Sequence, residues 1–239
     1  MGLFGRKYSI AETGLPDGFT DCHCHILPGV DDGVRTMDES LAILKCYEDL
    51  GIREVWLTPH VMEDVPNTTS GLQSRYEELS EKYQGKIRLH LAAEYMMDSL
   101  FEQRLMAGDL LTLGNGGGHV LVETSYFNPP TRMTEVLKDI KSAGLFPVLA
   151  HPERYMYMDM DDYAALSDSG VRLQLNLPSL AGNYGPDVQK KAFMLLKKGY
   201  YDIAGTDLHR RQQLDTLFTR RCLPRKIFKA GLSERLITL

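Results

Sequence analysis

The chain has 239 residues, of which 43% are hydrophobic, and a formal net charge of −5 at pH 7. This length and composition suit one large domain with a globular core. The acidic balance and the lack of a long basic run argue against a dedicated nucleic-acid-binding protein. No run of about 18 apolar residues and no apolar core of a secretion signal are present, so we expect no membrane span and a cytoplasmic protein.

Segments rich in β-forming residues alternate with amphipathic segments along most of the chain. We predict strands near residues 19–26, 54–59, 87–94, 119–124, 146–151, 172–177 and 202–207. We predict helices near residues 37–50, 71–83, 99–106, 131–143, 159–169 and 186–198, and a further helix from about Arg211. Gly144, Gly170 and Gly199 each follow a predicted helix, where a left-handed residue is typical.

This alternation predicts an α/β protein with a parallel sheet. Because about seven such units fit into one chain, we favour a single closed or nearly closed barrel over an open sheet. We assign residues 19–239 to this domain and residues 1–18 to a loose N-terminal extension.

The stretch Asp21-Cys22-His23-Cys24-His25 is the most informative one. Side chains alternate along a strand, so His23 and His25 point the same way if the segment is extended. Two imidazoles on one inward face are a ready pair of metal ligands. By the same alternation, we expect Cys22 and Cys24 to face the helices as small buried thiols.

Further candidate ligands stand at the carboxyl ends of predicted strands or in the loops beyond them, where barrels of this kind carry their active sites. They are Asp32, His60, Glu94, Glu123, His151, Asp207 and His209. Clustered carboxylates repel one another unless cations neutralise them. Nitrogen and oxygen ligands without sulfur favour two or three divalent ions such as Mn²⁺, Fe²⁺ or Zn²⁺. His90 and His119 fall at strand beginnings, and we predict that they bind no metal.

Arginines follow the candidate ligands in the same loops: Arg154 after His151, and Arg210 and Arg211 after His209. A guanidinium group binds phosphate through paired hydrogen bonds, so metals beside arginines indicate a phosphorylated substrate. Arg132 is a weaker candidate. None of the four cysteines has an arginine six positions later, so the C-x5-R loop of cysteine-based phosphatases is absent. This leaves metal ions as the means of catalysis.

These residues, in this order, resemble the PHP superfamily (polymerase and histidinol phosphatase). The motifs that carry the resemblance are His23-x-His25, Asp32, Thr58-Pro59-His60, Glu94, Glu123, His151-Pro152-Glu153-Arg154 and Asp207-x-His209. The run HILPGVDDG at residues 25–33 is similar to the CpsB/CapC (YwqE-type) bacterial tyrosine-protein phosphatases of capsule and exopolysaccharide loci. The likeness extends from about Phe19 to His209.

The resemblance implies a distorted (β/α)7 barrel of the PHP fold and a three-metal cluster, most often manganese. It implies three ligand sets: His23, His25, Glu94 and Asp207 for one ion, Glu94, Glu123 and His151 for a second, and Asp32, His60 and His209 for a third. It also implies a catalytic group of Arg154, Arg210, Asp207 and His209, with Arg211 as an alternative to Arg210 for binding phosphate.

The implied function is hydrolysis of phosphotyrosine, with the tail of a tyrosine autokinase in polysaccharide synthesis as the partner. A small-molecule phosphatase for histidinol phosphate or a nucleotide phosphoesterase would use the same metals, and an inactive metal-binding regulatory module is the non-enzymatic alternative. Loops at residues 61–70, 124–131 and 179–186 would select the substrate. Their Tyr126, Phe127 and Tyr184 are candidates to flank an aromatic ring. A homo-oligomer stays open.

Overall fold

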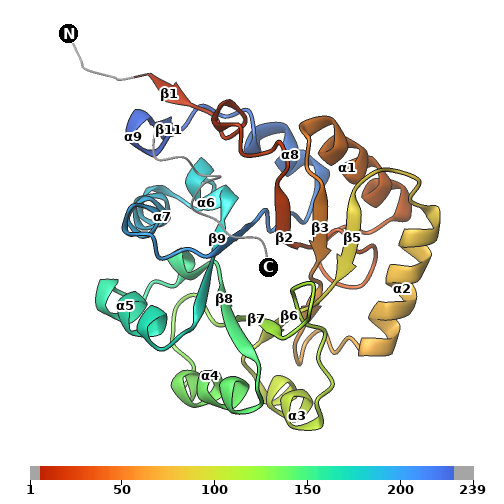
Figure 1. Ribbon diagram of the computed structural model, residues 1–239, viewed down its shortest axis with the longest axis vertical. Coiled ribbons are helices and arrows are strands. Elements are labelled where there is room, and N and C mark those ends of the chain that lie inside the picture. The colour runs from red at the N-terminus through yellow and green to blue at the C-terminus, as the bar shows by residue number, and fades with distance from the viewer. Residues whose placement is uncertain (1–5, 229–239) are drawn as a thin grey trace.

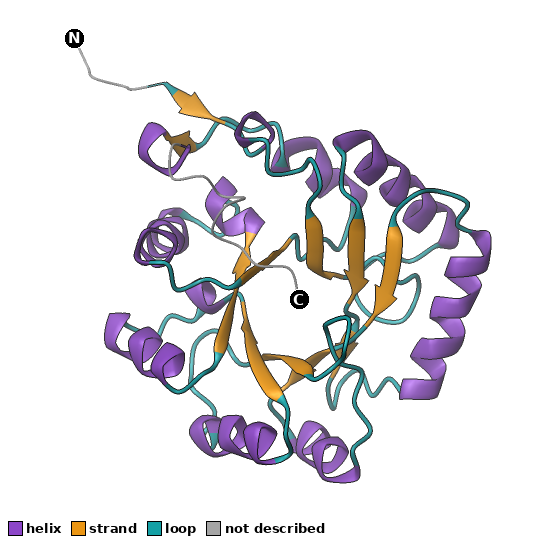
Figure 2. Ribbon diagram, viewed as in Figure 1, coloured by secondary structure: helices purple, strands orange, loops and turns teal. Residues whose placement is uncertain are grey.

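The computed structural model describes residues 6–228, in which helices surround curled parallel sheets (Figures 1 and 2). The strands are β1 (Lys7–Tyr8), β2 (Thr20–Cys24), β3 (Glu54–Leu57), β4 (His60–Val61), β5 (Arg88–Leu91), β6 (Glu94–Met96), β7 (His119–Glu123), β8 (Phe146–Ala150), β9 (Arg172–Asn176), β10 (Ile203–Gly205) and β11 (Leu223–Pro224). The α-helices are α1 (Met37–Leu50), α2 (Thr69–Lys82), α3 (Ser99–Ala107), α4 (Met133–Ser142), α5 (Met160–Asp168), α6 (Leu177–Ala181), α7 (Pro186–Lys198), α8 (Arg211–Leu217) and α9 (Arg225–Phe228). Short 3-10 helices cover Ala11–Thr13 and Pro152–Arg154.

Two parallel sheets form the centre of the molecule. Six strands pair in the order β10-β9-β8-β7-β6-β4, and three pair in the order β2-β3-β5. Two of the predicted strands are each broken in two: β3 and β4 are separated by Thr58 and Pro59, and β5 and β6 by Ala92 and Ala93. Backbone hydrogen bonds from Ala92 N to Leu57 O (2.9 Å) and from Glu94 N to Pro59 O (3.1 Å) keep the pieces in register.

Hydrogen bonds also join the segment after β10 to β2. Asp207 donates its N–H to His23 O at 2.8 Å, and His25 donates to Leu208 O at 2.9 Å. The parallel strands therefore curl around a shared interior, with helices on the outside (Figure 1). The prediction of an α/β fold with parallel strands is confirmed.

The core has two parts. The larger lies between the strands and the helices and includes Ile43, Leu44 and Tyr47 on the buried face of α1. The smaller is built mostly from strand side chains that point into the shared interior: Cys22, Trp56, Ala92, Leu113, Leu121, Val148, Ala150 and Ile203. These side chains fill the interior between the strands, so an active site can lie only at the strand ends.

A β-bulge interrupts the alternation of side chains in β2. Asp21 pairs with Val55 and Cys24 pairs with Leu57, so Cys22 and His23 together oppose the single residue Trp56. The extra residue turns both of these side chains towards the interior. The prediction that Cys22 faces the helices is therefore wrong, whereas Cys24 packs in the larger core as predicted.

Residues 6–18 are packed against the domain and are not loose. β1 pairs antiparallel with β11, with Tyr8 opposite Leu223. Ile10 and Leu15 are buried in the larger core. The expectation of a loose extension failed because the partner strand lies more than 200 residues away in the sequence, and local patterns carry no sign of it.

None of the helices within residues 6–228 is long and apolar enough to cross a membrane.

Candidate metal centre

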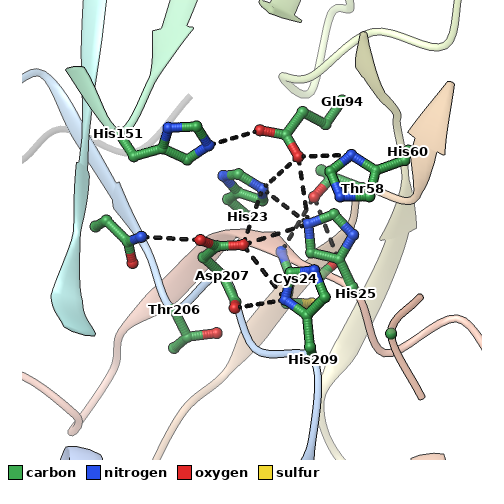
Figure 3. Close-up of polar contacts among 12 residues, drawn as sticks. His23, Cys24, His25, Thr58, His60, Glu94, His151, Thr206, Asp207 and His209 are labelled. Carbon is green, nitrogen blue, oxygen red and sulfur yellow. Dashed lines mark hydrogen bonds and ion pairs between the residues drawn. The ribbon is translucent and has the colours of Figure 1, made fainter. Parts of the chain in front are cut away.

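The predicted ligands converge on one side of the sheets (Figure 3). Most lie at or beyond the carboxyl end of a strand, whereas His60 and Glu94 are the first residues of the short β4 and β6, which follow β3 and β5. They form four overlapping groups, and within each group one ligand atom per residue lies within 4.8 Å of all the others. The groups are His25, Asp32, His60 and His209; His23, His25 and Asp207; His23, Glu94 and His151; and His60, Glu94 and Glu123. All nine predicted residues belong to at least one group, so the structure brings the whole set together.

The structure brings together the residues of the three implied sets but divides them into four groups, in which Glu94 lies with His23 and His151 and not with His25 and Asp207. His25 joins the set of Asp32, His60 and His209, and Glu123 groups with His60 and Glu94 and not with His151. Glu94 belongs to two groups, which is the arrangement expected of a residue that bridges two ions.

Glu94 lies at the centre of the cluster. Its Oε2 is 3.1 Å from His23 Nε2, 3.3 Å from His25 Nε2 and 3.2 Å from His60 Nδ1. Its Oε1 is 3.0 Å from His151 Nε2. One fully buried carboxylate thus faces four imidazoles, as Figure 3 shows.

The contacts within the cluster are not those of a completed hydrogen-bond network. His23 Nε2 and His25 Nε2 face each other at 3.1 Å, although a neutral pair offers at most one shared proton between them. Glu94 Oε2 and His60 Nδ1 are buried and, among the residues that the structure describes, form no hydrogen bond despite their proximity. Lone pairs that converge on common points without protons between them fit a set of divalent cations.

The charges of the cluster point the same way. Burial alone would lower the pKa of His23, but the Glu94 carboxylate raises it to about 9. Burial would raise the pKa of Glu94 and of Asp207, yet the neighbouring histidines hold both pKa values well below the ordinary range. A hydrogen bond from His209 lowers the pKa of Asp32 to about 2. The carboxylates therefore stay ionised beside the imidazoles, and metal cations compete with the imidazole protons for the same ligand atoms.

Two residues that the sequence analysis missed orient the histidines. Asp31 Oδ2 is 2.9 Å from His25 Nδ1 and accepts a hydrogen bond from the His60 backbone N–H at 3.0 Å. Gln174 Oε1 is 3.0 Å from His23 Nδ1 and accepts from the His151 N–H at 3.1 Å. With a proton on each Nδ1, the Nε2 atoms of His23 and His25 are left free to bind metal. A polar Gln174 between the apolar Leu173 and Leu175 was the available signal.

Two of the candidate ligands have a strained backbone. His151 has φ 35° and Asp207 has φ 49°, and they are the non-glycine residues with positive φ in the described part of the chain. His151 directly follows β8, and Asp207 follows β10 after the single residue Thr206. Left-handed conformations are uncommon for non-glycine residues and are concentrated at functional sites.

The predicted arginines divide into one at the centre and two on the surface. Arg154 is 17% exposed, and its Nη1 donates to Asp207 Oδ2 at 2.9 Å. Arg210 and Arg211 are exposed, and neither forms an ion pair among residues 6–228. Arg132 pairs with Glu102 at 2.6 Å, and neither residue belongs to the cluster.

Comparison with known proteins gives the family. A family model described as capsular polysaccharide synthesis, CpsB/CapC, matches residues 19–223. The chain belongs to the CpsB/CapC family. It is 28% identical over 195 residues to the tyrosine-protein phosphatase YwqE of Bacillus subtilis, covering 79% of this chain and 76% of that one. It is 27% identical over 204 residues to the tyrosine-protein phosphatase CpsB of Streptococcus pneumoniae, covering 79% and 82% of the two chains.

A solved structure shares the fold of this CpsB/CapC chain. It comes from work on YwqE of Bacillus subtilis and CpsB of Streptococcus pneumoniae, described there as unique metal-dependent tyrosine phosphatases. The TM-score is 0.78 at 24% identity, over 90% of this chain and 88% of that one.

The cysteines of the CpsB/CapC chain are not arranged for catalysis. Cys22 and Cys24 are fully buried, and burial raises the pKa of both thiols. Burial also raises the pKa of the Cys222 thiol, which donates to Leu180 O and belongs to none of the ligand groups. A nucleophilic cysteine needs a lowered pKa, which these buried thiols lack.

Proposed function

We propose that this protein is a metal-dependent protein-tyrosine phosphatase. The observation that carries the proposal is the convergence of five histidines and four carboxylates into four ligand groups beside the Arg154 guanidinium. The family membership supports it, since YwqE and CpsB carry the name tyrosine-protein phosphatase. A phosphate ester is the substrate that an arginine beside a metal cluster is suited to bind.

The nine clustered residues would hold two or three divalent ions, with His23, His25, Asp32, His60, Glu94, Glu123, His151, Asp207 and His209 as ligands. The mixed nitrogen and oxygen set favours Mn²⁺, with Fe²⁺ and Zn²⁺ as alternatives. When bound, such ions activate water and neutralise charge on the phosphoryl oxygens. Asp31 and Gln174 keep the imidazoles in the protonation state needed for ligation.

The remaining catalytic work falls to the cationic side chains. Arg154 would bind the phosphoryl oxygens from the side of Asp207, and Arg210 or Arg211 would approach from the surface. A tyrosine leaving group has a pKa near ~10 and needs less protonation than a serine alkoxide, which favours aryl phosphates. Arginine donors aimed at the developing charge stabilise the transition state.

The finer identity of the protein follows from this proposal. The substrate would be the phosphotyrosine-bearing tail of a tyrosine autokinase that controls capsule or exopolysaccharide synthesis, which places the enzyme in the cytoplasm. The hydrogen bonds between β2 and the segment after β10 support a distorted (β/α)7 barrel of the PHP type.

Chelation tests the proposal. We expect exhaustive EDTA treatment to abolish hydrolysis of p-nitrophenyl phosphate and of a phosphotyrosine peptide, and Mn²⁺ to restore both. His151→Ala should be inactive, while His119→Ala at the opposite strand ends serves as the matched control. Activity that survives both chelation and His151→Ala would overturn the proposal.

Two further measurements separate the alternatives. Faster turnover of histidinol phosphate or a nucleotide than of the phosphotyrosine peptide would favour a small-molecule phosphatase. Substoichiometric metal at neutral pH together with no turnover would favour a regulatory module.

A further inference from the structure

The guanidinium group of Arg154 lies between two tyrosine rings. Its Cζ atom is 4.2 Å from the ring centroid of Tyr126 and 4.2 Å from that of Tyr184. Tyr126 follows β7, and Tyr184 lies between α6 and α7, so two distant segments enclose the same side chain. At this distance both rings attract the cation through their negative faces. The tyrosines that were expected to flank a substrate ring flank Arg154.

The rings are themselves held in place. Tyr126 stacks on Tyr155 (centroids 6.1 Å apart), which stacks in turn on Tyr157 (5.8 Å). The Tyr126 carbonyl accepts a hydrogen bond from Met156 N at 2.9 Å. On the other side, the Tyr184 hydroxyl reaches Asp207 Oδ2 at 3.4 Å. Each tyrosine therefore has contacts of its own besides the one with Arg154.

The donors of Arg154 are largely unused. A guanidinium group has five N–H donors. Within residues 6–228 the Arg154 side chain donates one hydrogen bond, from Nη1 to Asp207 Oδ2 at 2.9 Å. Both tyrosine rings lie within cation–π distance of the group, and the side chain is still 17% exposed, so a ligand can reach the edge that carries the other donors. A planar edge with free donors matches a tetrahedral oxyanion.

We propose that Tyr126 and Tyr184 are positioning residues that hold the Arg154 guanidinium ready for the phosphoryl group of the substrate. This inference rests on the proposed function and adds to it two residues that act through Arg154. An arginine that is already fixed loses less conformational freedom when phosphate binds. The rings therefore stabilise the phosphate complex in the ground state and the transition state alike, which lowers KM and leaves kcat unchanged.

The test compares Tyr126→Leu with Tyr126→Phe in the metal-loaded full chain. For Tyr126→Leu we expect KM for a phosphotyrosine peptide and the dissociation constant of inorganic phosphate to rise together by about fivefold, with kcat within about twofold of wild type. Tyr126→Phe keeps the stacked ring, and the Tyr126 hydroxyl forms no hydrogen bond in the described part of the chain, so this variant should match wild type.

A double-mutant cycle shows whether the tyrosine acts through the arginine. In an Arg154→Ala background, Tyr126→Leu should change neither KM nor phosphate affinity any further. An equal effect in both backgrounds, or no effect in either, would overturn the proposal. Phosphate affinity is measured by calorimetry without turnover. The wild-type protein could bind phosphate without hydrolysing any substrate, and Tyr126→Leu could still weaken phosphate binding. That result would contradict the proposed function and support the positioning role.

Discussion

The two ends of the parallel strands carry the same kinds of side chain in opposite arrangements. At the amino ends, Glu54 accepts a hydrogen bond from Arg88 at 3.0 Å and lies 2.7 Å from His90 Nε2, and the His90 ring stacks on Trp56. On the side of the metal cluster, imidazole nitrogens face each other, and Glu94 Oε2 has no hydrogen bond to any residue from 6 to 228.

This difference separates structural from functional histidines. The cluster around Glu54 is completed by its own residues, because each acceptor meets a donor. The cluster around Glu94 presents several lone pairs to the same points and is completed only by cations. The way in which a histidine is paired therefore tells more about its role than the presence of acidic residues near it.

The largest expected effect comes from removing the charge of Glu94, with the same substitution at Glu54 as the matched control. Glu94→Gln should lower phosphatase activity by ~100-fold or more and reduce the metal content of the chain, because a central ligand is lost. Glu54→Gln should leave both unchanged. Steady-state kinetics and atomic absorption on the two variants check this, and equal losses in both would erase the distinction between the two ends.

A smaller effect is expected from the residue that orients His25. Asp31→Asn should weaken metal binding by about 10–100-fold, because the His25 Nδ1 proton loses its carboxylate acceptor. Calorimetric titration with Mn²⁺ measures this. The exposed Asp38→Asn on α1 is the matched control, since it changes the same group away from the cluster. Wild-type affinity in Asp31→Asn would show that His25 does not need this partner.

The sequence was a good guide to the strands and to the residues at their ends. His23, Glu94, His151 and Asp207 were found because each follows or enters a β-rich segment at the carboxyl side, and parallel strands bring those ends together. The helix predicted near residues 37–50 is found at Met37–Leu50, where Gly51 ends it with φ 89°.

The errors arose where distant contacts override local patterns. A bulge in β2 reversed the direction of Cys22, and nothing in the sequence marks the extra residue. Residues 6–18 were misjudged because their partner β11 lies at the other end of the chain. The role of Tyr126 was missed because a cation–π contact with Arg154 depends on loop geometry, which residue spacing does not describe.

The hydrogen-bonded cluster around Glu54 should contribute to the stability of the fold. Glu54→Gln should reduce the free energy of unfolding by about 1–2 kcal/mol, because a buried carboxylate that accepts from Arg88 and faces His90 is replaced by a neutral amide. Urea denaturation measures the change. Lys45→Met removes an exposed ion pair with Asp49, which solvent screens, and should change stability by less than Glu54→Gln does. A larger loss in Lys45→Met would show that burial does not set the ranking.

The smallest expected effect is a pH dependence of that same difference. Burial raises the pKa of Glu54, but the hydrogen bonds from Arg88 and His90 outweigh it and leave the pKa below its ordinary value. A lowered folded-state pKa gives stability that is complete above the ordinary glutamate pKa and is lost as the pH falls through the folded value. The stability gap between wild type and Glu54→Gln should therefore narrow between about pH 5 and pH 3. A gap that widens on acidification would contradict the assignment.

The left-handed backbone at His151 and Asp207 has a consequence for anyone who engineers this enzyme. Each such residue costs on the order of 1 kcal/mol, and glycine or asparagine would relieve that cost. Directed evolution that selects only for resistance to heat would favour substitutions at these two positions, which are candidate metal ligands. The selected variants would be more stable but inactive, so a selection for thermal stability must also measure turnover in every round.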